Sequence, residues 1–274
     1  QFLNVANNFL ETKAGYANTG TWSTKAIKEA NLLGEVVELS SSKDANFNYI
    51  PKGFDIPSDL DYLHITTNNT IYGTQYKSLP KTNVPLISDS SSDIFSRLID
   101  FSKFDLLYAG AQKNMGPAGA TLVVAKEDAL GKVSRQIPSM LDYKIHADKD
   151  SMFNTPPVFA VYTSMLTLEW LKEKGGIAAI EKENDAKAAL IYDEIDRNNL
   201  FDGFAAKEDR SSMNATFTLN EASLKESFEN KAKEAGLNVE VSIPRYEEPT
   251  WTGYKPGNPQ VYMGWATPEE HNVI

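Results

Sequence analysis

The chain has 274 residues, no cysteine, and a formal net charge of −10 from 37 acidic and 27 basic side chains. Apolar residues make up 41% and charged residues 23%, which excludes a disordered, collagen-like or coiled-coil chain. The acidic balance argues against a nucleic-acid partner, and the missing thiols exclude disulfides, thiolate zinc sites and cysteine nucleophiles. No apolar run approaches the roughly 18 residues that cross a membrane, and a cytoplasmic location fits this composition.

The first half of the chain alternates helix-like and strand-like segments. An amphipathic helix is predicted at residues 1–11 and a second helix at 23–33, with Ser23 or Thr24 as its N-cap and Gly34 just past its end. Residues 67–69 read as a polar loop. Short apolar runs predict strands at residues 35–39, 62–66, 84–88, 106–109 and 121–125. Strands separated by helices indicate an α/β domain with a largely parallel sheet.

The second half of the chain has a different character. Pro156 and Pro157 open a long predicted helix that runs to about Lys174, and a more charged helix follows at residues 177–198. The remaining segments predict a strand at 214–219, a helix at 221–235 and a strand at 239–243. We therefore expect a large domain at residues 1–196 and a smaller, incomplete α+β domain at residues 197–274, whose tail at 244–274 has no clear period.

Two residues that follow predicted strands are candidates for chemistry. Ligands of open α/β sheets bind at the carboxyl ends of the strands, where the sequence places Asp89 and Lys113. Small residues surround Lys113, so its amine can be partly desolvated and become a Schiff-base nucleophile. An acid at a neighbouring strand end suits a pyridinium nitrogen. The alternative is a solvated loop lysine and an aspartate that caps a turn.

Six segments of the chain resemble one known family, in that family's order. The segment YAGAQKNMGPAG at 108–119 is similar to the cofactor-lysine segment of the phosphoserine aminotransferases, which are class-V, fold-type I pyridoxal-phosphate enzymes. The other five are GYANTGTWSTKAIKEA at 15–30, HITTNNTIYGTQ at 64–75, SDSSSDIFSR at 88–97, MLDYKIHADKDSMFNTPPVFAVY at 140–162 and KEDRSSMNATF at 207–217. The resemblance spans about residues 1–240 and implies the fold-type I architecture.

The resemblance implies a catalytic pair and a cofactor, pyridoxal 5'-phosphate. Lys113 would form a Schiff base with the cofactor and, once released by the substrate amine, would move the proton between the substrate and the cofactor. Asp89 would keep the pyridine nitrogen protonated. The implied reaction is the transfer of an amino group from glutamate to 3-phosphohydroxypyruvate, a step of serine biosynthesis.

Five further residues would bind the cofactor together with this pair. Trp22 would stack on the ring, Thr70 would donate to its 3-oxygen and Gln112 would contact its phosphate. Asn154 and Thr155 would reach the cofactor phosphate of a partner subunit, which implies a homodimer with shared sites. The structural alternatives are a core tryptophan, a helix N-cap at Thr70, and a simple helix start at Asn154 and Thr155.

The sequence departs from the family at both ends. The family's phosphate loop and a His-Arg pair would precede Gln1, so we expect an N-terminal truncation, and the family's later substrate-binding arginines have no match near Arg245. Arg97 and Arg210 lie in matched segments, where we expect structural salt bridges. Another fold-type I aminotransferase and a non-catalytic truncated homologue therefore stay open as alternatives. The histidines lack metal-ligand spacing, and we expect His64 to be a packed strand residue.

Overall fold

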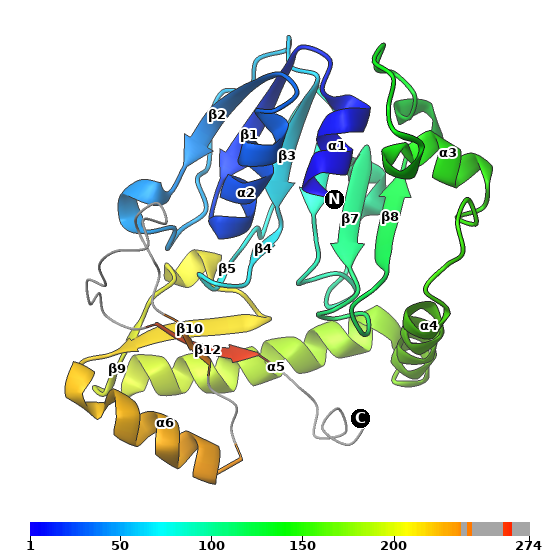
Figure 1. The fold of residues 1–274 in the computed structure, drawn as a ribbon. Coiled ribbons are helices and arrows are strands. Elements are labelled where there is room, and N and C mark those ends of the chain that lie inside the picture. Colours follow the sequence, from blue (N-terminus) through cyan, green and yellow to red (C-terminus); the bar gives the residue numbers. More distant parts are fainter. Residues whose placement is uncertain (237–239, 243–259, 265–274) are drawn as a thin grey trace.

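The computed structural model describes residues 1–236, 240–242 and 260–264, in which a larger and a smaller sheet are the main features (Figure 1). The larger sheet has six strands in the order β2-β1-β3-β6-β7-β8. All neighbours in it are parallel except β7 and β8, which run antiparallel. The strands are β1 (Lys13–Asn18), β2 (Glu35–Ser41), β3 (Tyr62–Thr66), β6 (Leu86–Asp89), β7 (Leu106–Gly110) and β8 (Thr121–Ala125).

This sheet confirms the predicted α/β class and all five strands predicted for it. The sequence analysis missed β1, because its residues Lys13–Asn18 are rich in Ala and Gly and carry no β-branched side chain. β1 is nevertheless buried between β2 and β3, where Gly15 lets Leu39 and Leu60 approach. A Cβ atom at Gly15 would lie 2.7 Å from the tip of each leucine, so packing overrides the weak strand propensity.

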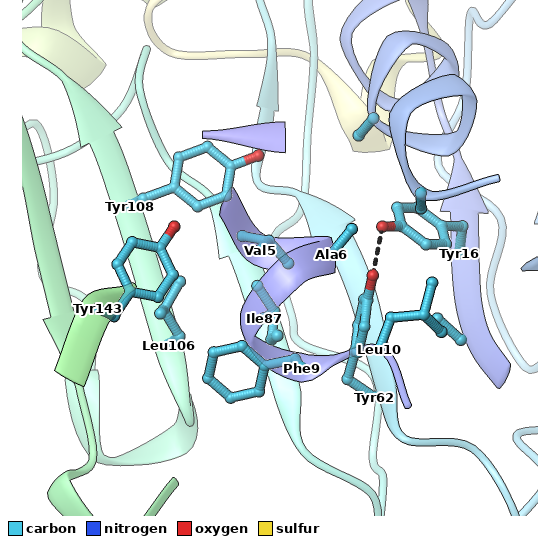
Figure 2. Close-up of a cluster of buried hydrophobic side chains, with 13 residues drawn as sticks. Val5, Ala6, Phe9, Leu10, Tyr16, Tyr62, Ile87, Leu106, Tyr108 and Tyr143 are labelled. Carbon is cyan, nitrogen blue, oxygen red and sulfur yellow. Dashed lines mark hydrogen bonds between the residues drawn. The ribbon is translucent and has the colours of Figure 1, made fainter. Parts of the chain in front are cut away.

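Helices α1 (Phe2–Phe9) and α2 (Thr21–Ala30) pack on one face of the larger sheet. Figure 2 shows the buried cluster between them and the strands, in which the Tyr16 and Tyr62 hydroxyls are 2.7 Å apart. His64 lies in the same layer, 1% exposed, with its Nε2 atom 3.0 Å from the Tyr108 hydroxyl. Burial lowers the pKa of His64 to about 3, which confirms a packed, neutral histidine.

The start of α2 differs from the prediction. Gly20, rather than Ser23 or Thr24, is the N-cap residue, and Ser23 lies within the first turn. The Ser23 hydroxyl accepts hydrogen bonds from the backbone N–H groups of Thr19 and Gly20, both at 2.9 Å. Ser23 therefore stabilises the turn between β1 and α2 although it lies within the helix. The sequence pattern alone does not distinguish this role from that of an N-cap residue.

The segment after β3 was wrongly predicted as a loop. It forms a hairpin of β4 (Asn68–Asn69) and β5 (Thr74–Gln75), with Thr70 in the turn. Gly73 closes the turn at φ +66°, and a Cβ atom there would lie 2.3 Å from Thr216 Oγ1. The sequence Thr-Asn-Asn at 67–69 reads as a loop because strands of two residues leave no periodicity.

The second half of the chain builds the smaller sheet, in the order β11-β12-β10-β9. The predicted helices at 177–198 and after Pro157 appear as α5 and α4, and the strand at 214–219 appears as β10. β9 was not predicted, and the unpatterned tail holds β12. The elements are α3 (Tyr143–Asp148), α4 (Val158–Glu173), α5 (Gly176–Arg197), β9 (Phe201–Gly203), β10 (Asn214–Leu219), α6 (Lys225–Glu234), β11 (Glu240–Ser242) and β12 (Gln260–Gly264).

Helix α5 contributes to the core beside the smaller sheet. Ala188, Tyr192 and Ile195 pack with Phe217 and Leu219 of β10. This core thus begins before residue 197 in the chain, and the division at that residue stays a prediction. Most of the predicted tail, at 244–259 and 265–274, and positions 239 and 243 of the predicted last strand lie outside the described residues.

The packing of α1 gives a test of the core. Leu10 is fully buried and its Cγ atom would lie 3.0 Å from a Cβ at Gly34. Leu10→Ala should lower the free energy of unfolding by about 2–5 kcal/mol, because the packed surroundings of Leu10 would not fill the cavity that the substitution leaves. Leu32→Ala is the control, since Leu32 is 70% exposed, and it should change the value by less than about 0.5 kcal/mol in urea titrations. Equal losses in both variants would contradict the packing.

Candidate functional site

The candidate site lies at the carboxyl edge of the larger sheet. The parallel pairing aligns Thr66 with Asp89 and Asp89 with Tyr108, so β3, β6 and β7 end side by side. The chain after each strand end then supplies one predicted residue: Thr70 follows β3, Asp89 ends β6 and Lys113 follows β7. The topology therefore brings together side chains that are 19 and 24 positions apart in the sequence.

Lys113 is the centre of this arrangement. Its ammonium donates a hydrogen bond of 2.8 Å to the Thr70 hydroxyl and lies 5.2 Å from the centroid of the Trp22 ring. Trp22 sits in the first turn of α2, and its ring also lies 4.7 Å from the Lys25 ammonium. The Lys113 amine thus contacts two other predicted residues, Thr70 and Trp22. No helix follows Thr70, so Thr70 is not a helix N-cap.

Asp89 lies beneath this group and is almost fully buried. Its Oδ1 atom accepts hydrogen bonds from the Ser91 backbone N–H at 2.9 Å and the Ser91 hydroxyl at 2.6 Å. No described residue donates a hydrogen bond to Oδ2 of Asp89, so one oxygen of the carboxylate is available to a further donor. Ser91 also accepts from the Gly110 backbone N–H at 3.1 Å, which ties Asp89 to the end of β7.

The two charged groups influence each other's protonation. Burial raises the pKa of Asp89, while the hydrogen bonds from Ser91 and the charge of Lys113 oppose this rise. Lys113 is an exposed residue, yet partial desolvation by the surrounding protein lowers the pKa of its amine, and Asp89 and Asp93 act in the opposite direction. A lysine with a lowered pKa supplies more neutral amine at physiological pH, as a nucleophile or a general base requires.

The other three predicted residues lie apart from the amine. Gln112 is exposed and folds back over Gly110, where a Cβ atom would lie 2.5 Å from its Oε1 atom. Asn154 and Thr155 are exposed on the segment before α4, and no hydrogen bond joins them to the other predicted residues in the described parts of the chain. Their predicted role therefore depends on a second subunit.

Ser91 is the residue at this site that the sequence analysis missed. The only signal for it was the serine run 88–92 around Asp89, which does not show which serine turns back to the carboxylate. The expected salt bridges of Arg97 and Arg210 are confirmed, since they pair with Asp93 at 2.9 Å and Asp196 at 2.7 Å. Neither guanidinium is free to bind a substrate anion in this arrangement.

Comparison with known proteins agrees with this geometry. The Aminotransferase class-V family matches residues 12–239. The phosphoserine aminotransferase of Flavobacterium johnsoniae is 63% identical over 239 residues, which cover 86% of this chain and 67% of that protein. The enzyme of the same name from Flavobacterium psychrophilum is 60% identical over 240 residues, 87% of this chain and 67% of that protein. The solved phosphoserine aminotransferase of Bacillus circulans subsp. alkalophilus has a TM-score of 0.83 and 40% identity, with 86% and 67% covered.

The fold and the lysine site define a class-V aminotransferase, a fold-type I enzyme that depends on pyridoxal 5'-phosphate. Within this class the chain belongs to the phosphoserine aminotransferase family. It spans about two thirds of the length of the relatives that it matches.

The described residues fit this cofactor. The Lys113 amine, the Thr70 hydroxyl and the Trp22 ring face one another, and Asp89 has an oxygen without a donor. The Trp22 Nε1 atom is also buried without a hydrogen-bond partner among the described residues. A flat, polar aromatic cofactor satisfies such a set, because it offers a ring to Trp22, a carbonyl carbon to the amine and a ring N–H to the acid.

The raised pKa of Asp89 gives a test that needs no cofactor. The folded chain binds this proton more tightly than the unfolded chain, whose aspartates titrate near pH 4. Ionised Asp89 therefore destabilises the fold increasingly as the pH rises through its folded pKa. We expect cofactor-free Asp89→Asn to melt at a higher temperature than the parent near pH 7, with the difference vanishing near about pH 3.5.

The matched control is Asp128→Asn, at an exposed position. Its melting temperature in calorimetry should follow the parent at every pH. A melting temperature of Asp89→Asn that is lower than the parent's near pH 7, or a difference that does not vary with pH, would contradict the assigned effect of burial.

Proposed function

We propose that this chain carries out the transfer of an amino group from glutamate to 3-phosphohydroxypyruvate, in serine biosynthesis in the cytoplasm. The observation that carries the proposal is the Lys113 ammonium held at 2.8 Å by Thr70 beside the Trp22 ring, at the end of a strand neighbouring Asp89. The family membership supplies the substrates, because the relatives bear the name phosphoserine aminotransferase.

Each residue has a defined task in this proposal. When bound, pyridoxal 5'-phosphate supplies the reactive carbonyl and an electron-accepting ring. Lys113 would hold that carbonyl through its amine and, once the substrate amine had displaced it, the freed amine would move the proton of the substrate Cα atom. Asp89 would keep a proton on the ring nitrogen through its Oδ2 atom, while Ser91 fixes its Oδ1 atom.

The remaining predicted residues orient the ring. Trp22 and Thr70, which both contact the Lys113 ammonium, would hold the ring by stacking and by donation from the Thr70 hydroxyl. Gln112 contacts the cofactor phosphate in this proposal, which requires its side chain to leave Gly110. A rigid set of this kind raises the rate by presenting the substrate Cα atom to the amine in a fixed orientation.

The proposed assembly is a homodimer formed through α4. This helix exposes apolar side chains, among them Val158 at 68% and Phe159 at 72%, with Val161 and Tyr162 beside them. A continuous apolar surface of this kind on a water-exposed helix is typical of an interface. Since Asn154 and Thr155 directly precede α4, docking of this helix on a second copy brings them to the partner's site.

The catalytic lysine is tested by trapping the cofactor. After addition of pyridoxal 5'-phosphate and borohydride, mass spectrometry should find the reduced cofactor on the peptide with Lys113, and Lys113→Ala should carry none. Lys25→Ala is the matched control, because Lys25 also contacts Trp22, and it should still be labelled at Lys113. Glutamate–phosphoserine exchange should fall at least about 100-fold in Lys113→Ala.

Two outcomes would favour the alternatives. Labelling of Lys113 without any exchange supports a non-catalytic homologue, and exchange with other amino donors but not with phosphoserine supports another fold-type I aminotransferase. Labelling of Lys113→Ala at a different lysine would refute the assigned residue.

The dimer is tested by a charge on the apolar helix. Phe159→Glu should raise the dimer dissociation constant at least about 100-fold in sedimentation experiments, since a buried unpaired carboxylate costs several kcal/mol. Leu190→Glu is the control on α5, where Leu190 is 73% exposed, and its association should equal that of the parent. If the dimer of Phe159→Glu has the same dissociation constant as that of the parent, the interface lies elsewhere.

A further inference from the structure

A cavity of about 380 Å³ lies away from the lysine site, between loops of the large sheet and the segment that leads to β10. Its walls combine apolar side chains, including Ile50, Phe54, Ile56 and Leu79, with the lysines Lys52, Lys77 and Lys81. Hydrogen bonds join the two sides nearby, from Ala206 N–H to the Asn48 carbonyl at 2.7 Å and from Ile50 N–H to the Oδ2 atom of Asp209 at 2.9 Å. The cavity is therefore built into a fixed junction of the fold.

The charges around this cavity are not balanced. Asp209, which is 2% exposed, is the one carboxylate among the lining residues, and it is engaged by Lys52 at 3.0 Å. Lys77 and Lys81 form no ion pair with a carboxylate in the described part of the chain. The Lys77 ammonium instead donates to the Gln75 Oε1 atom at 2.8 Å. Desolvation and the nearby Arg97 lower the pKa of Lys77, against the opposing effect of Asp185, Asp209 and Asp93.

Tyr76 forms part of the cavity wall and is only 3% exposed. Its hydroxyl is closed to solvent and has no hydrogen-bond partner among the described residues, so it is not a contact for a ligand. The cavity thus offers the Lys77 ammonium to a ligand, beside apolar walls.

We propose that this cavity, here called the Lys77 cavity, binds a small monocarboxylate with an aromatic or branched apolar body. The carboxylate pairs with the Lys77 ammonium, and the apolar body lies among Phe54, Ile56 and Leu79. A single carboxylate suits the Lys77 ammonium, which has no carboxylate partner in the described part of the chain, whereas a phosphate dianion would leave oxygens against the apolar walls. The volume lies at the lower end of small-molecule pockets, which matches a ligand of about ten non-hydrogen atoms.

The test uses 3-phenylpropanoate, titrated calorimetrically into the 274-residue chain loaded with pyridoxal 5'-phosphate. We expect a dissociation constant of about 1 mM or tighter. The neutral 3-phenylpropan-1-ol should bind at least about tenfold more weakly, because it cannot pair with the ammonium. This comparison needs no variant and stays decisive even where a substitution unfolds the chain.

Variants then locate the binding. Lys77→Met should weaken 3-phenylpropanoate at least about tenfold, while Lys132→Met, at an exposed lysine outside the cavity, should leave the affinity unchanged. Lys113→Ala should also leave it unchanged, which separates this cavity from the aminotransferase site. Unchanged melting and cofactor absorbance show that Lys77→Met is folded.

Five results would overturn the proposal. Four are no binding up to about 10 mM, equal binding of the alcohol, an unaffected Lys77→Met, and loss of binding in Lys113→Ala. The fifth is displacement by equimolar inorganic phosphate, which would show that the cavity prefers a bare anion. None of these results touches the assignment of Lys113, so the two proposals fail separately.

Discussion

The parallel register of β3, β6 and β7 is the constraint on which the candidate site depends. It places Asp89 opposite Thr66 and Tyr108, so that three strand ends share one edge of the sheet. Residues that begin the following loops then meet without any local sequence relation. A slip of one residue in β6 would turn Asp89 to the other face of the sheet, away from Lys113.

Burial of Asp89 shows how stability and function oppose each other at this edge. The carboxylate gives up most of its hydration, and the described chain compensates only through Ser91 at Oδ1 and the charge of Lys113. Such partial compensation is typical of sites that are completed by a cofactor, because the protonated ring supplies the missing donor. Ionised Asp89 therefore lowers the stability of the cofactor-free fold, and a bound cation restores that stability.

The sequence predicted those parts of the structure that carry a local signal. Apolar runs located β3, β6, β7 and β8, and prolines and glycines located the ends of α4 and α5. The Ala- and Gly-rich β1 and the short hairpin around Thr70 have no such signal, since their conformations follow from neighbouring strands and from Thr216.

The candidate site shows the same limit. Its position after a strand pointed to Lys113, and family resemblance added Trp22 and Thr70, which the fold brings into contact with it. It gave no indication of Ser91, whose hydrogen bonds arise only from the turn that follows β6. The antiparallel direction of β8 was equally hidden, because strand direction is a property of the connection and not of the strand.

Helix α5 connects the segment that follows β6 to the core of the smaller sheet. Near its start, Glu181 accepts from the Leu98 backbone N–H at 3.2 Å and Asn184 donates to the Ser96 carbonyl at 3.1 Å, on the segment that follows Asp89. Near its end, Tyr192 and Ile195 are embedded in the core of the smaller sheet. Helix α5 is thus fixed near both of its ends. A displacement of the smaller sheet is then transmitted through α5 to residues 94–98, which follow Asp89 in the chain, unless the helix bends.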